Sequence, residues 1–164
     1  MEILTLQHRE FDLYCFNNNI NDETVSEFKD TAFISIIGSE ECRKYYNNND
    51  KIHWFKNEHD NVLNLEFDDV TEDVINDNVK FTSMTIEQAK KCVDFIDRNK
   101  GKTFIVHCFA GISRSGAVSQ FIYDFYNDEN IYEKFKEYNS HIMPNNYVLT
   151  LLKRVFYEKN NIFK

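Results

Sequence analysis

Short apolar runs along the chain predict three buried strands. Residues 32–37 read Ala-Phe-Ile-Ser-Ile-Ile and stop at Gly38, which is typical of a buried strand. Residues 62–67 alternate well enough between apolar and polar positions to form a second strand. Residues 103–106 are predicted to be a third strand, apolar on both faces, as the central strands of parallel sheets usually are.

Helices are predicted between and after these strands, because apolar residues there repeat at helical spacing. Thr85 and Gln88 fit a capping box, and the apolar positions behind them repeat at helical spacing to about Asn99. A wide apolar stripe begins after Ser113, and a last helix carries Val148, Leu151, Leu152, Val155 and Phe156. Because strands and helices alternate, we expect an α/β fold: a single domain over residues 1–164 with a mainly parallel central sheet flanked by helices.

Composition and charge narrow the classes of function. The chain of 164 residues has 27 acidic and 19 basic side chains, a formal net charge of -8, which disfavours nucleic acid and anionic membranes as partners. The four cysteines show no close pairs and no metal-ligand spacing. The first residues lack the pattern of a secretion signal, and no apolar stretch approaches the roughly 20 residues that span a bilayer. We therefore expect a cytoplasmic protein with reduced thiols.

The segment of residues 107–116, His-Cys-Phe-Ala-Gly-Ile-Ser-Arg-Ser-Gly, carries the candidate chemistry. It lies where a predicted strand ends and a helix begins, the place where open α/β sheets bind ligands. A thiol at a helix N-terminus can have its pKa lowered to about 3.5–7.5, so Cys108 is the candidate nucleophile. The backbone N–H groups of the following residues can form a nest for a tetrahedral oxyanion; these residues are Phe109, Ala110, Gly111, Ile112 and Ser113.

Three side-chain properties complete this phosphate-binding segment. Arg114 presents a planar fork that can hold two phosphate oxygens. Ser115 places a hydroxyl near the sulfur, where it can stabilise the thiolate as a leaving group. Gly111 relieves the backbone where the segment must turn tightly. Nucleophile, anion nest and charged clamp thus occupy eight consecutive positions.

Residues 107–115 resemble the active-site loop of the cysteine-dependent protein tyrosine and dual-specificity phosphatases: His-Cys, five residues, Arg, then Ser or Thr. Residues 110–115 are especially similar to the MAP-kinase-phosphatase type. The family order of strand, acidic residue, capped helix and strand is followed from residue 62 to residue 125. The resemblance implies a phosphatase-like fold and a phosphoprotein phosphatase that acts on phosphotyrosine, with phosphoserine and phosphothreonine as additional candidates.

The resemblance also implies a general acid after the strand at residues 62–67, where Asp68 and Asp69 are adjacent. The second acid fits the role in family members, so Asp69 is predicted to protonate the leaving oxygen and then to act as base towards water. Asp69 precedes Cys108 by 39 positions, several more than is usual in the family, with residues 71–80 as the expected excess.

Other residues are interpreted as structural. His53 and His59 are predicted to be surface histidines, since no acidic or thiol partner stands at ligand spacing. Residues 43–46, Arg-Lys-Tyr-Tyr, are predicted to form a solvated loop, with a basic-aromatic edge that meets the phosphorylated substrate as the alternative. Asn145 is expected to cap the last helix, and Cys92 is expected to pack in the core.

Two alternatives to a protein phosphatase remain open at this point. A catalytically weak phosphate-binding module would keep Arg114 and the loop amides to hold a phosphorylated partner. An RNA 5′-triphosphatase uses a similar loop, although the acidic charge and the absence of basic clusters count against it.

Because the loop amides and Arg114 can neutralise the phosphoryl charge, we expect no metal ion and no cofactor to take part. Hydrolysis of para-nitrophenyl phosphate by the purified protein should therefore be unchanged after treatment with EDTA. Activity that is lost with EDTA and restored by a divalent cation would contradict this expectation.

Overall fold

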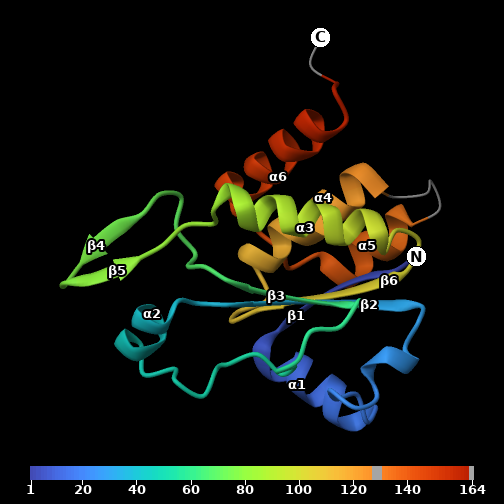
Figure 1. Cartoon of the computed structure of the whole chain (residues 1–164), viewed down its shortest axis with the longest axis horizontal. Helices are drawn as coiled ribbons and strands as arrows, with labels where there is room; N and C mark the ends of the chain where they lie inside the picture. Colours follow the sequence, from blue (N-terminus) through green and yellow to red (C-terminus); the bar gives the residue numbers. More distant parts are fainter. Residues whose placement is uncertain (127–130, 163–164) are drawn as a thin grey trace.

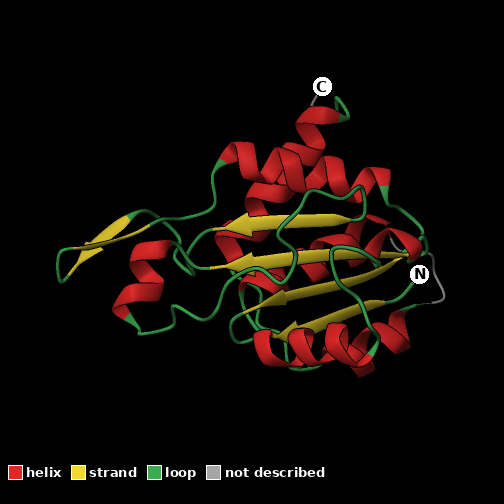
Figure 2. Ribbon diagram, turned by 60° about the horizontal axis from the view of Figure 1, so that its bottom comes forward, coloured by secondary structure: helices red, strands yellow, loops and turns green. Residues whose placement is uncertain are grey.

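The computed structural model describes residues 1–126 and 131–162. Four strands form one sheet in which every pairing is parallel, so all four arrows point the same way (Figure 2). In spatial order the strands are β1 (Ile3–Gln7), β6 (Thr103–Cys108), β2 (Thr31–Ile37) and β3 (Val62–Glu66). The α/β fold with a mainly parallel sheet is thereby confirmed, and so are the three predicted strands. The strand that ends in Cys108 is central, with a partner on each side.

Helices cover both faces of this sheet (Figure 1). One face carries α3 (Ile86–Arg98), α4 (Arg114–Tyr126), α5 (Tyr132–Asn139) and α6 (Asn146–Lys159). The opposite face carries α1 (His8–Asn17) and a short 3-10 helix, η1 (Val25–Glu27). Beyond the carboxyl ends of the strands lie α2 (Glu40–Tyr45) and a hairpin made of β4 (Val74–Asn76) and β5 (Val79–Phe81).

The predicted helix starts are formed by the residues that signalled them. Thr85 Oγ1 accepts from the Gln88 N–H at 3.2 Å, and Gln88 Oε1 accepts from the Thr85 N–H at 2.9 Å, which completes the capping box of α3. Asn145 Oδ1 accepts from the Val148 N–H at 3.1 Å and caps α6.

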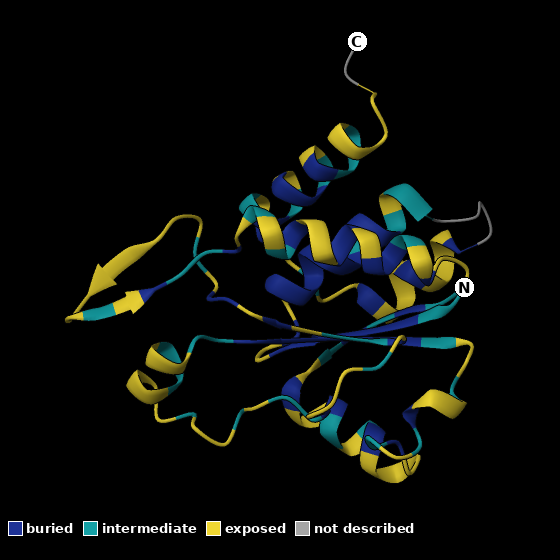
Figure 3. Cartoon of the chain, in the orientation of Figure 1, coloured by how far each residue is buried: buried dark blue, intermediate teal, exposed yellow. Residues whose placement is uncertain are grey.

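The core has two layers because the central strands are apolar on both faces, as Figure 3 shows by their burial. Ile34 and Ile36 of β2 face the larger layer beneath α3, α4 and α6, where Cys92 is fully buried as predicted. The intervening Phe33 faces the smaller layer against α1, together with Phe11 and Phe55. The alternation of side chains along one strand therefore holds both layers of helices.

The structure corrects the prediction for residues 43–46, which belong mainly to α2 and do not form a solvated loop. Ser39 Oγ accepts from the Cys42 N–H at 3.2 Å and caps this helix. Glu40 and Glu41 occupy its first turn and Arg43 and Lys44 its last, which matches the helix dipole.

The extra residues expected between the acidic pair and Cys108 form the β4–β5 hairpin. Asp77 and Asn78 at its turn have φ of 49° and 61°, as a two-residue type I′ turn requires. The hairpin is closed at its base, where the Asp68 N–H donates to the Thr82 carbonyl at 2.7 Å. Phe81 then packs against the rings of two tyrosines at the end of α2: Tyr45, its last residue, and Tyr46, which follows it.

The free edge of β1 is closed by one side chain of α5. Asn139, which is 3% exposed, accepts from the Thr5 N–H at 3.0 Å and donates to the Ile3 carbonyl at 2.8 Å. It therefore pairs a backbone donor and a backbone acceptor that would otherwise be buried without partners.

Asn139→Ala should destabilise the fold, because it leaves these two backbone groups of β1 unpartnered. At about 1–3 kcal/mol for each unsatisfied group, we expect the free energy of unfolding to fall by about 2–6 kcal/mol in urea titrations followed by circular dichroism. Asn160→Ala is the control, because that exposed amide only donates to the Phe156 carbonyl at the end of α6. Equal unfolding midpoints for the two variants would show that Asn139 does not hold the edge.

Candidate active site

The segment after β6 folds back onto the end of β1. Gly111 has φ of +70°, and a Cβ placed on it would lie 2.5 Å from the Gln7 nitrogen and 2.6 Å from the Leu6 carbonyl carbon. Any other residue would combine a disfavoured backbone conformation with a clash against backbone. The absence of a side chain at Gly111 thus allows residues 108–114 to close into a compact loop before α4 begins.

Cys108 lies at the base of this loop with its sulfur supported from the following helix. Its Sγ is 3.0 Å from Ser115 Oγ, and both residues are buried. Burial raises the pKa of the Cys108 thiol, but the charge of Arg114 and hydrogen bonds from Ser115 and the Ile112 backbone outweigh it, so the pKa lies below its ordinary value. The site therefore favours the thiolate.

Arg114 is held beside the loop with part of its guanidinium left unpaired. Its Nη1 donates to the Phe67 carbonyl at 2.9 Å, which fixes the side chain against the end of β3. Its Nε is buried and has no hydrogen-bond partner among the described residues. An unpaired buried donor costs about 1–3 kcal/mol, a cost that an oxyanion in the loop would remove.

The two adjacent acids have different environments. Asp68 is buried and accepts from the Ser39 N–H at 2.8 Å, the Ser39 hydroxyl at 2.7 Å and the Thr82 N–H at 2.8 Å. These bonds join the start of α2 to the end of the hairpin, which is a structural role.

Asp69 is exposed and faces the loop. Its Oδ1 accepts from the Ser113 hydroxyl and from the Asn145 side-chain amide, each at 2.8 Å. The same residue that caps α6 thus also holds this carboxylate. The structure brings Asp69, and not Asp68, into contact with the phosphate-binding segment.

These groups surround a cavity of about 360 Å³. Cys108, Ser113 and Arg114 line it from the loop, and Asp69 lines it from the end of β3. The remaining walls come from α1, from α2 and the residues after it, and from β5: His8, Cys42, Arg43, Tyr46, Lys51 and Phe81. Arg43 and Tyr46 therefore form a basic-aromatic edge beside the site, which was the alternative interpretation of residues 43–46.

The structure also corrects the prediction that His53 and His59 are surface residues. His53 Nδ1 is 2.7 Å from Ser35 Oγ, which is also 2.7 Å from His107 Nε2. Burial lowers the pKa of His53 to about 4, with smaller effects of Lys56 and Arg43. His59 is half-buried and has an acidic partner after all, with Nε2 at 2.8 Å from Asp22 Oδ1. His107 is fully buried behind the loop.

Several residues of the cavity carry no signal in the sequence. His8, Cys42 and Phe81 stand in no recognisable sequence motif, and each reaches the cavity only through tertiary packing.

Among the described residues no group of three or more His, Cys, Asp or Glu side chains could hold a metal ion. Within the same part of the chain, no helix has the length and apolar character needed to cross a membrane.

The pKa values of the four cysteines predict selective alkylation of Cys108. Burial raises the pKa of Cys15, Cys42 and Cys92 to about 12, whereas the pKa of Cys108 is lowered. Iodoacetamide at neutral pH should therefore modify Cys108 first, and the rate should fall only as the pH drops through this lowered pKa. Ser115→Ala removes a hydrogen bond to the thiolate and should move the rate profile to higher pH.

Peptide mass spectrometry after timed alkylation gives these rates. Ser140→Ala, at an exposed serine beyond α5, is the control and should keep the profile of the parent protein. A profile that is the same for Ser115→Ala and the parent would contradict the assigned support of the sulfur.

Residues 17–156 match the family model described as dual specificity phosphatase, catalytic domain. Among solved structures, the PTP-2 phosphatase of Cydia pomonella matches with 15% identity and a TM-score of 0.50, over 94% of this chain and 85% of that chain. PTPMT1 in complex with PI(5)P matches with 17% identity and a TM-score of 0.49, over 99% and 95% of the two chains. No curated protein matches. The family match spans far more than half of the chain, and the chain therefore belongs to the dual specificity phosphatase catalytic domain family.

Proposed function

We propose that the protein is a phosphoprotein phosphatase that hydrolyses phosphotyrosine, and also phosphoserine and phosphothreonine, through a phosphocysteine intermediate. The observation that carries the proposal is the pairing of a buried low-pKa thiol with a buried guanidinium that keeps an unpaired donor, in one cavity with Asp69. A nucleophile, an anion clamp and a proton donor are the parts that phosphoryl transfer needs.

In the first step, the Cys108 thiolate attacks phosphorus in line with the leaving oxygen. The sulfur–phosphorus bond forms as the phosphorus–oxygen bond breaks, while the loop amides and Arg114 hold the three equatorial oxygens. Asp69 donates a proton to the leaving oxygen. Its hydrogen bonds with Ser113 and Asn145 keep the carboxyl group over the loop during this step.

In the second step, water attacks the phosphorus of phosphocysteine. The Asp69 carboxylate accepts a proton from this water, and the sulfur–phosphorus bond breaks to give inorganic phosphate and the Cys108 thiolate. The Ser115 hydroxyl, 3.0 Å from the sulfur, stabilises the departing thiolate by donating a hydrogen bond to it.

The walls of the cavity support an aromatic phosphoester on a protein. Tyr46, Phe81 and Phe109 line the cavity and offer apolar surface to an aryl ring. The other cationic side chains at the cavity already have carboxylate partners. Arg43 Nη1 lies 3.4 Å from Glu66 Oε1, and Lys51 Nζ lies 2.9 Å from Asp50 Oδ2. A substrate with several phosphate groups would find few free cations, which disfavours inositol phosphates and RNA 5′-triphosphates.

Activity measurements with phosphopeptides test this proposal. We expect turnover of a phosphotyrosine peptide, slower turnover of the matched phosphothreonine peptide, and none by Cys108→Ser. Asp69→Asn should lower kcat for the phosphotyrosine peptide by about 10²–10⁴, the typical contribution of general acid catalysis. The loss should be smaller for para-nitrophenyl phosphate, because its leaving group needs little protonation.

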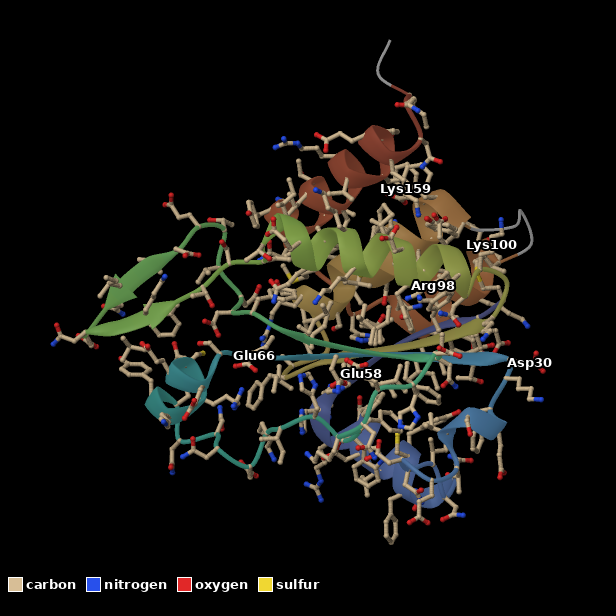
Figure 4. All side chains as sticks on the ribbon, in the orientation of Figure 1. Asp30, Glu58, Glu66, Arg98, Lys100 and Lys159 are labelled. Atoms are coloured by element: carbon tan, nitrogen blue, oxygen red, sulfur yellow. The ribbon has the colours of Figure 1, made fainter. Side chains whose placement is uncertain are left out.

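Asp30→Asn is the matched control, since Asp30 lies at the opposite end of the sheet from the cavity (Figure 4). Its activity should equal that of the parent protein. No turnover by the parent protein between pH 5 and 8 would favour the phosphate-binding module instead. Undiminished turnover by Asp69→Asn would remove Asp69 from the mechanism.

A further inference from the structure

His8 is a buried histidine of the cavity that the mechanism does not use. It is the first residue of α1, directly after β1, and is only 3% exposed. Its backbone N–H donates to the Phe109 carbonyl at 3.2 Å, which ties the start of α1 to the loop. Its side chain lines the cavity together with Cys108, and its ring lies edge-on to His107 with 5.1 Å between centroids.

A carboxylate lies behind the imidazole. Asp12, one turn further along α1, places Oδ2 3.4 Å from His8 Nε2. The other oxygen, Asp12 Oδ1, is buried without a hydrogen-bond partner among the described residues. A half-buried carboxylate with an unused acceptor oxygen can stabilise an imidazolium ion beside it.

Without a bound anion, the surroundings disfavour the charged form of His8. Burial lowers the pKa of His8, and the attraction of Asp12 offsets this only in part. The other titratable groups that act on or face the ring come from β6 and from the segment between α2 and β3: His107, Asp50, Lys51, His53 and Lys56. Burial likewise raises the pKa of Asp12, and the attraction of His8 offsets this only in part.

We propose that His8 is an anion-responsive residue of the cavity, which takes up a proton from solvent when a phosphate dianion occupies the loop of residues 108–114. Two negative charges in the cavity favour the charged form of a neighbouring imidazole, and Asp12 stabilises that form from the other side. His8 then adds a positive charge to that of Arg114. The inference rests on the proposed function only in that the loop must hold a phosphate-like anion.

The sign of the pH dependence follows from this linkage. The anion raises the pKa of His8, so the affinity that His8 contributes is complete at acid pH and is lost as the pH rises through this raised pKa. A purely structural His8, needed only for its backbone bond to Phe109, would contribute no such dependence.

The test measures binding of inorganic sulfate, which stays dianionic from pH 5 to 8, by isothermal titration calorimetry. All proteins carry Cys108→Ser, so that the thiolate does not titrate. Between pH 8 and pH 5.5 the Kd of this parent should fall by about tenfold more than the Kd of its His8→Gln variant, as expected for gaining one charge-assisted hydrogen bond. His59→Gln is the matched control, because His59 also contacts a carboxylate but does not line the cavity.

Equal pH dependence of the parent and the His8→Gln variant would overturn the proposal, and so would failure of the parent to bind sulfate at any pH. If His8→Gln does not fold, the His8 ring signals in the NMR spectrum of the parent decide the question: its pKa must rise on addition of sulfate. Absence of phosphatase activity in the protein with Cys108 intact would sink the proposed function alone, since these measurements involve no turnover.

Discussion

The whole arrangement depends on keeping a negative charge stable on a sulfur atom that is almost completely buried. Cys108 is 2% exposed, and burial by itself favours the neutral thiol. The interactions that favour the thiolate come from the loop amides, Ser115 and Arg114. Each of these groups must itself be held in position by other parts of the structure. Arg114 is held by the Phe67 carbonyl, and the loop amides are held by the close contact of Gly111 with the end of β1. The stability of one charge therefore connects three of the four strands.

Two adjacent aspartates show how the same residue type acquires different roles. Asp68 has its oxygens occupied by Ser39 and Thr82, so it is a structural link between α2 and the hairpin. This link fixes the backbone from which Asp69 reaches towards Ser113 and Asn145. The rigid position of the first acid is what gives the second acid a defined place over the loop.

How much of this could be predicted from the sequence depends on how far apart the interacting residues lie along the chain. The capping box at Thr85, the strand at residues 32–37 and the loop after Cys108 rest on neighbours within a few positions, and all were predictable. The pairing of Thr5 with Asn139 spans 134 positions, and that of His59 with Asp22 spans 37, so no local pattern signalled either of them.

The same reasoning explains why local patterns did not signal β1, α1 and α2. In α1 the buried apolar residues are Phe11 and Cys15, and the face they bury exists only after β1, β2 and β6 have paired. The helix α2 shows charges that match its dipole, but it is only 6 residues long. Its place is set by contacts with β5 and by the bond between Ser39 and Asp68, which cannot be seen in either segment alone.

The closed base of the hairpin has a consequence for how this chain can vary in evolution. Asp68 and Thr82 are 14 positions apart but are joined by hydrogen bonds in both directions, from the Asp68 N–H and from the Thr82 N–H. The segment between them is therefore anchored at two neighbouring points, and its length has no mechanical effect on the strand before it or the helix after it. Residues 71–80, which include neither Asp69 nor the cavity-lining Phe81, can therefore vary in length and sequence while the geometry of the site is kept, so this part of the segment is where related phosphatases can diverge in what they recognise.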